Sequence, residues 1–178
     1  MNRIKWAEKK AYQLLEEYQI NDFPIPLEDI VERLNVKLIR EFLEDTVSGL
    51  LYRTSTNTII GVNSYHSDKR QRFTVAHEIG HLIMHEGDPV HIDLQVNFRM
   101  KNSLSTDMRE VEANAFAAAL LMPENLVREA IQEMNEGIDL SCDLNDSEED
   151  SKIRELSERF QVSQHSLLIR LGKLGLIY

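Results

Sequence analysis

Three of the six histidines in this chain, His77, His81 and His85, fall within nine consecutive residues. Residues 77–81 read His-Glu-Ile-Gly-His, an H-E-x-x-H sequence. Residues i and i+4 share one face of a helix, so both imidazoles of this motif can bind a single Zn²⁺. Glu78 then lies beside the metal and can hydrogen-bond a metal-bound water instead of binding the metal. The spacing is typical of a zinc site with Glu78 beside a metal-bound water.

The flanks of this motif favour a buried helix. Residues 74–84 contain no proline, and Glu78 is the only charged residue among them. A buried charge is costly unless it has a partner, and a metal-bound water would be one. The alternative is a core helix whose histidines hydrogen-bond to carbonyl groups. Two histidines and an acid at this spacing favour the metal site.

A catalytic zinc needs a third protein ligand and an open fourth position. Glu110 is the preferred candidate, because it shares a helix face with Asn114 among small alanines. We expect Asn114 to hydrogen-bond a ligating imidazole and so fix its tautomer. Glu112, about 200° round the helix from Glu110, is a weaker candidate. His85 is also weaker as a ligand, because a helix-end position where imidazolium is favourable suits it better.

Four stretches of the chain resemble the ImmA/IrrE family of zinc metallopeptidases. They are Pro24–Leu34, Ser48-Gly49-Leu50, Gln71–His85 and Glu110–Pro123. The resemblance implies a compact α+β, gluzincin-like fold, with zinc held by His77, His81 and Glu110 and with Glu78 as catalytic base. It also implies a protein substrate, because relatives are linked to cleavage of helix-turn-helix repressors in mobile elements or in a stress response. One departure is Asn114, where an aspartate often stands; a neutral amide raises the basicity of a histidine less.

Peptide hydrolysis also needs a donor for the developing oxyanion, often a Tyr or His. Tyr52, Tyr65, His66 and His91 are the candidates, and the sequence leaves the choice open. Hydrophobic and polar residues alternate strictly over Val90–Phe98, which predicts a half-exposed strand. That its edge accepts an extended peptide as an added strand is the less favoured hypothesis, and a plain sheet or loop element is the more favoured one.

The surrounding pattern predicts an α+β fold: a mainly helical zincin-like domain with a small antiparallel sheet and a C-terminal helical pair. Helical spacing covers about residues 3–19, 26–34, 67–85, 106–122 and 124–135. Residues 36–63 are β-branched and turn-rich, which predicts two or three antiparallel strands with a hairpin near residue 55.

Three segments follow from this pattern. Residues 1–135 form the predicted zinc metallopeptidase domain, and residues 136–151 form an acidic linker with seven negative charges and no Lys or Arg. Residues 152–178 form a tail of two short helices that resembles a helix-turn-helix and carries a net charge of about +3. We expect the tail to pack against the peptidase or to grip a partner; contact with DNA is the less favoured role.

Composition narrows the function classes. The 178 residues include 20 Lys+Arg and 30 Asp+Glu, a formal net charge of −10, which argues against general nucleic-acid affinity. The single cysteine, Cys142, cannot supply a thiolate-built zinc site and favours a cytoplasmic protein. No apolar run approaches the roughly 20 residues of a membrane-spanning helix. A zinc endopeptidase, a non-catalytic regulator that binds a repressor or DNA, and a toxin–antitoxin component remain.

Overall fold

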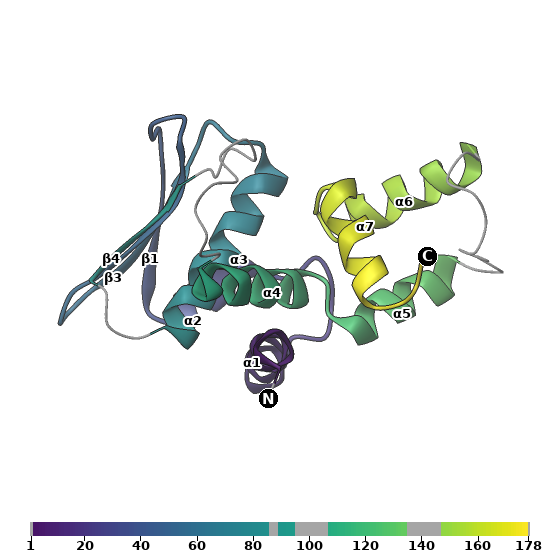
Figure 1. Cartoon of the computed structure of the whole chain (residues 1–178), viewed down its shortest axis with the longest axis horizontal. Coiled ribbons are helices and arrows are strands. Elements are labelled where there is room, and N and C mark those ends of the chain that lie inside the picture. Colours follow the sequence, from purple (N-terminus) through teal and green to yellow (C-terminus); the bar gives the residue numbers. More distant parts are fainter. Residues whose placement is uncertain (1, 86–88, 95–106, 135–146, 178) are drawn as a thin grey trace.

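The computed structural model describes residues 2–85, 89–94, 107–134 and 147–177, and Figure 1 shows how their elements are arranged. A sheet stands at one end, helices α3 and α4 follow, and α5–α7 lie at the other end. The helices are α1 (Arg3–Glu17), α2 (Leu27–Arg33), α3 (Asp68–Met84), α4 (Met108–Leu121), α5 (Glu124–Met134), α6 (Ser147–Arg159) and α7 (Gln164–Lys173). The strands are β1 (Val36–Glu41), β2 (Val47–Arg53), β3 (Thr58–Asn63) and β4 (Val90–Leu94). The α+β fold class is confirmed.

The sheet has the order β1-β3-β2-β4 and is mixed. The predicted hairpin near residue 55 is present: β2 and β3 are antiparallel, and the Thr54 N–H donates to the Asn57 carbonyl at 2.8 Å. The expectation of an antiparallel sheet is wrong for β1, which pairs with β3 in parallel. The chain reverses direction between β1 and β2 and again in the hairpin, so β1 and β3 run the same way. Asn63, the last residue of β3, is buried, and its side chain donates to the carbonyl of Val47, the first residue of β2, at 2.9 Å. This hydrogen bond holds the two strand ends together.

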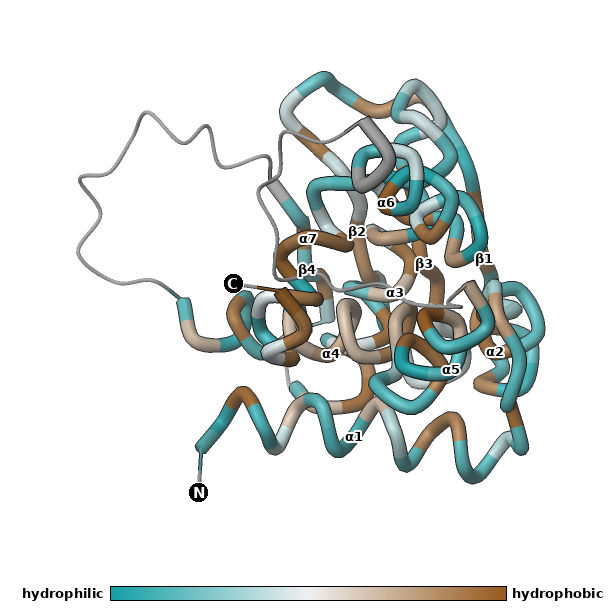
Figure 2. The backbone as a smooth tube through the Cα atoms, turned by 90° about the vertical axis from the view of Figure 1, so that its right-hand side faces the viewer, coloured by the Kyte–Doolittle hydropathy of each residue, from teal (hydrophilic) through white to brown (hydrophobic). Residues whose placement is uncertain are grey.

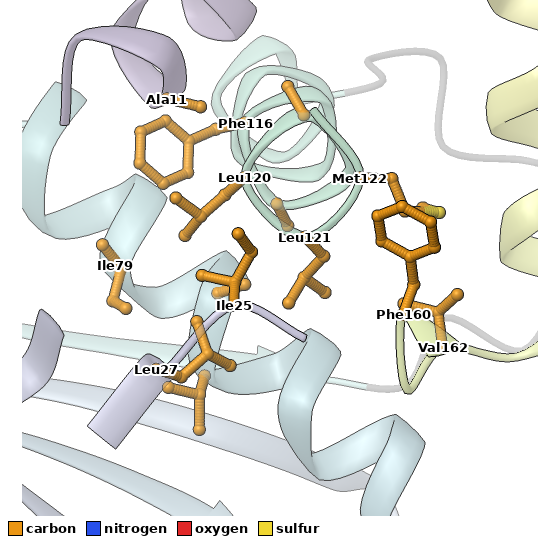
Figure 3. Close-up of a cluster of buried hydrophobic side chains, with 14 of the residues drawn as sticks. Ala11, Ile25, Leu27, Ile79, Phe116, Leu120, Leu121, Met122, Phe160 and Val162 are labelled. Carbon is orange, nitrogen blue, oxygen red and sulfur yellow. The ribbon is translucent and has the colours of Figure 1, made fainter. Parts of the chain in front are cut away.

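The hydrophobic core lies where α3 and α4 meet the sheet and α1. Ala7 and Ala11 of α1 and Ala113, Ala117 and Ala119 of α4 are fully buried, because small side chains let the two helices approach closely. Figure 3 shows Phe116, Leu120 and Leu121 of α4 beside Ile79 of α3. The outer helix α1 alternates between hydrophilic and hydrophobic residues, as an amphipathic helix at the surface does (Figure 2). This core brings α4 alongside α3.

The C-terminal helices pack against the rest of the protein. Phe160 and Val162 lie near Met122 in the core (Figure 3), and the Phe160 ring stacks on Phe23 at 4.5 Å between centroids. Arg170 of α7 is 1% exposed, and its guanidinium donates to the Met122 carbonyl, to Glu8 and to the Tyr12 hydroxyl. This cation is therefore not available to a phosphate backbone.

The predicted linker falls mostly outside the described residues. Residues 135–146 are among those that the structure does not describe, whereas 147–151 belong to α6. The helical tail therefore begins at Ser147, five residues before the predicted start. No helix in the described part of the chain is long and apolar enough to cross a membrane.

Candidate metal centre

Helix α3 carries the H-E-x-x-H sequence on its buried face. The Nε2 atoms of His77 and His81 lie 3.0 Å apart, and the two residues are 3% and 2% exposed. Four residues of an α-helix make little more than one turn, which stacks the two rings on the same face. At its C-terminal end the helix is tied to the sheet, because Arg53 of β2 donates to the His81 carbonyl at 2.7 Å.

Glu110 of α4 completes a compact group of donors. Its Oε2 lies 3.2 Å from His77 Nε2, and its Oε1 lies 3.2 Å from His81 Nε2. Gly80 permits this approach of α4, because a Cβ there would lie 3.1 Å from Phe116 Cδ1 and 3.3 Å from Ala113 Cα. Of the three candidates for the third ligand, the structure brings Glu110 to the paired imidazoles.

The electrostatics of this group suit a divalent cation. Burial lowers the pKa of His81 to about 4, against the opposing effect of Glu110, so its imidazole is neutral at physiological pH. Burial alone would raise the pKa of Glu110, but hydrogen bonds from His77 and His81 hold that pKa far below its usual range. A neutral imidazole and an ionised carboxylate are the protonation states that bind metal.

Glu78 lies fully buried beside the donor group. Neither of its carboxylate oxygens has a hydrogen-bond partner among the described residues. Burial, reinforced by the nearby carboxylates of Asp93 and Glu110, raises the pKa of Glu78 well above its ordinary value. Gly49 of β2 makes room for it, because a Cβ at that position would lie 3.3 Å from Glu78 Oε1. An unpaired buried carboxyl with a raised pKa is a suitable carrier of a proton.

The second ring nitrogen of His81, Nδ1, contacts a series of two further side chains. The Nδ1 of His81 lies 3.1 Å from the Nδ1 of His85, and His85 Nε2 lies 3.0 Å from Glu112 Oε2. Glu112 is fully buried and also pairs with Arg3 of α1. If Nε2 of His81 binds metal, its Nδ1–H donates to His85, whose Nε2–H donates to Glu112. The sequence analysis missed this role for His85 and Glu112.

Asn114, the predicted support for a ligating imidazole, lies exposed on α4. The structure thus leaves it apart from the buried histidines, and His85 stands next to His81 instead. A signal in the sequence was available for His85, because it repeats the four-residue spacing of His77 and His81.

Among the four candidate oxyanion donors, His91 reaches the donor group. Its Nε2 lies 3.3 Å from Glu110 Oε1, and its ring centroid lies 3.8 Å from that of His81. Tyr52 and Tyr65 are exposed, and His66 lies near Arg70 and Asp93. A cavity of about 80 Å³ opens beside the histidines; it is lined by Arg53, His81, His85, His91, Asp107, Arg109 and Glu110.

The described residues thus offer donors for a metal ion. One donor atom each from His77, His81, His91 and Glu110 lie within 4.8 Å of one another, and so do donor atoms of His77, Glu78 and Asp93. Imidazole nitrogens with a carboxylate oxygen form a set that Zn²⁺ accepts. The arrangement can hold a divalent metal beside a buried acid, which is what metal-assisted hydrolysis requires.

Comparison with known proteins agrees with this chemistry. The model of the Peptidase M78 family, described as the IrrE N-terminal-like domain, matches residues 31–172. The chain therefore belongs to this family of metallopeptidases, and the resemblance seen in the sequence is confirmed. The match includes α6 and most of α7, so the helical tail is part of the family domain.

Two relatives and one solved structure are similar to this chain. The radiation response metalloprotease IrrE of Deinococcus radiodurans is 36% identical over 76 residues, 43% of this chain and 23% of the relative. An uncharacterized immunity region protein of Bacillus phage phi105 is 29% identical over 100 residues, 56% of this chain and 60% of the relative. A Mycobacterium tuberculosis transcriptional regulator has the same fold, with a TM-score of 0.59 and 19% identity over 93% of this chain and 46% of its own. Each match spans less than two thirds of the other protein.

Proposed function

We propose that this member of the Peptidase M78 family is a zinc-dependent endopeptidase that cleaves a protein partner. The observation that carries the proposal is the position of Glu78, which is buried next to the donors of His77, His81 and Glu110 and makes no hydrogen bond to any described residue. A scaffold that bound metal only for stability would have no use for an additional buried acid, which costs free energy.

Zinc is the proposed metal, held by His77, His81 and Glu110. When bound, it would polarise the scissile carbonyl and lower the pKa of water toward neutrality. The chain supplies the proton transfer: Glu78 accepts a proton from the attacking water and delivers it to the leaving amine. Burial raises the pKa of Glu78, so this carboxyl holds a proton more tightly than a solvated glutamate does.

The proposed substrate is an extended segment of a helix-turn-helix repressor from a mobile element or a stress response. Strand β4 supports an extended mode of binding, because it pairs with β2 on one side and no other described strand pairs with it on the other. Val90 and Ile92 of β4 are 48% and 51% exposed and can contact side chains of an added strand. The relative from a phage immunity region supports the repressor as substrate. The cytoplasmic location stays a prediction.

The test incubates the zinc-loaded full chain with the repressor encoded beside its gene and follows cleavage by mass spectrometry. We expect cleavage by the wild type, its loss with a chelator, and a fall in rate of at least about 10²-fold in Glu78→Gln. Glu129→Gln, an exposed change of the same kind on α5, is the matched control and should cleave normally.

Two outcomes would count against this proposal. Equal cleavage by wild type and Glu78→Gln would remove Glu78 from the mechanism. Binding of the repressor without cleavage by either protein would favour the non-catalytic regulator. Contact of the tail with DNA is opposed by the burial of Arg170, and a gel shift of duplex DNA by the full chain would revive it.

A further inference from the structure

His91 reaches the metal centre from strand β4 of the sheet, and its Nε2 lies close to Glu110 of α4. It lies on β4 opposite Leu51 of β2. Side chains alternate along a strand, so the exposed Val90 and Ile92 face outward while His91 and Asp93 face α3. The Nε2 of His91 is buried and makes no hydrogen bond in the described part of the chain, although the carboxylate oxygen Oε1 of Glu110 lies 3.3 Å away. A buried imidazole nitrogen that makes no hydrogen bond can be stabilised by a metal ion.

The distances among the donors match a four-residue site. With metal bonds of about 2.0–2.1 Å, the donor atoms of a tetrahedral site lie about 3.3–3.4 Å apart. The separations are 3.0 Å for His77 and His81, 3.2 Å for His81 and Glu110, and 3.3 Å for His91 and Glu110. The separation between His91 and Glu110 thus matches a shared metal ion, and one donor atom from each of the four residues lies within 4.8 Å of the others.

We infer that His91 is a fourth protein donor to the metal, so that the conformation described here is a closed form of the proposed peptidase. Metal sites with four protein donors are structural, whereas catalytic sites keep one position for water. Exchange of the His91 imidazole for water would open the site without any change in oxidation state. This inference rests on the proposed metallopeptidase function and adds to it a way of regulating access to the metal.

The location of His91 links opening of the site to substrate binding. Strand β4 is the edge strand that we propose as the docking site, and it is held in the sheet by β2 alone among the described strands. The pairing is also irregular between Val47 and Gly49. A peptide or partner that shifts β4 would withdraw His91 and open the fourth position, whereas one that leaves β4 in place would find the site closed.

The test uses Co²⁺ as the probe on the full chain, because a thiolate donor to Co²⁺ gives its own charge-transfer absorption. In His91→Cys we expect a thiolate-to-Co²⁺ band that the wild type lacks, since the wild type has only Cys142. In His91→Gln we expect the Co²⁺ dissociation constant to rise by at least about tenfold. Acetohydroxamate, which needs an open position, should bind Co²⁺-loaded His91→Gln at least about tenfold more tightly than Co²⁺-loaded wild type.

Two control variants separate coordination from damage to the strand. Ile92→Thr changes the adjacent, outward-facing residue of β4, and His165→Gln removes an exposed histidine of α7; both should bind Co²⁺ as the wild type does. Absence of the thiolate band in a folded His91→Cys that binds Co²⁺, or equal hydroxamate affinity in wild type and His91→Gln, would overturn the inference.

Failure of the proposed function gives a different result. A thiolate band together with no cleavage by wild type or His91→Gln would keep the four-donor site and reject the peptidase. Cleavage by the wild type, together with a metal affinity that does not change in the His91 variants, would keep the peptidase and reject the four-donor site. If His91 instead stabilised an oxyanion, His91→Gln would lose about 10²–10³ in rate with unchanged Co²⁺ affinity, which also contradicts the inference.

Discussion

The Nδ1 atoms of His81 and His85 lie 3.1 Å apart, which joins a proposed metal ligand to the buried carboxylate of Glu112. If the proton of His81 sits on Nδ1 and is donated to His85, Nε2 is free to bind metal in place of its hydrogen bond to Glu110. His85 occupies the C-cap of α3, where the helix has ended, and can therefore turn back toward His81.

We expect His85→Ala to raise the dissociation constant for Zn²⁺ by roughly 10–100-fold, because His81 loses its orienting acceptor. Competition with a chromophoric chelator measures this. The control is Asn114→Ala, an exposed residue on α4 that should bind zinc as the wild type does. A loss of affinity in Asn114→Ala alone would restore the sequence-based assignment of that residue.

Glu78→Gln should stabilise the metal-free protein at neutral pH by about 1–3 kcal/mol, because the variant no longer buries an unpaired carboxylate. The pKa of Glu78 is raised by burial and by Asp93 and Glu110, against an opposing effect of Arg53. The folded wild type thus binds its proton more tightly than the unfolded chain does. Its stability falls as pH rises from the unfolded pKa of about 4.3 to the raised pKa, and stays lower above it.

Urea unfolding in the presence of chelator, from pH 4 upward, checks this pH dependence. The stability difference between Glu78→Gln and wild type should be small near pH 4 and should grow with pH. A difference that is constant over the range, or that shrinks as pH rises, would show that Glu78 is not a buried acid with a raised pKa.

Gly80→Ala should weaken metal binding by roughly tenfold or more, because its Cβ would push α4, and with it Glu110, away from the histidines. The overpacking costs about 1–3 kcal/mol, of which the better helix propensity of alanine offsets about 1 kcal/mol. Gly172→Ala is the matched control: a Cβ there meets no atom within 4 Å, so we expect stabilisation by about 0.5–1 kcal/mol. Unchanged zinc affinity in Gly80→Ala would contradict the proposed role.

Arg170→Met should lower the free energy of unfolding by about 2–4 kcal/mol. The substitution removes a buried cation that bonds Met122, Glu8 and Tyr12, although the remaining Glu8 is partly exposed and can be hydrated. Lys173→Ala, an exposed basic residue three positions later, should change the stability by less than about 0.5 kcal/mol. Equal, small effects would mean that the tail is not anchored through Arg170.

Periodicity and spacing were sufficient to predict the elements and the motif. The four-residue spacing of His77 and His81 defines one helix face wherever that helix lies, because an α-helix has about 3.6 residues per turn. Alternation over residues 90–98 predicted a strand; β4 covers 90–94, and residues 95–98 lie outside the described part of the chain. The turn residues near position 55 predicted the hairpin. Each of these features depends on neighbours in the chain, so local sequence is enough to specify it.

The sequence alone left open those features that depend on contacts between distant segments. The parallel pairing of β1 with β3 follows from how the chain crosses the sheet, and no local pattern records it. The roles of Glu112, His85 and His91 depend on how α4 and β4 lie against α3, an arrangement fixed by the close approach at Gly80 and by the β2–β4 register. Side chains 27 residues apart, such as His85 and Glu112, meet only because the packed core holds their helices together. The sequence therefore determined which residues could do chemistry, and the tertiary structure decided which of them meet.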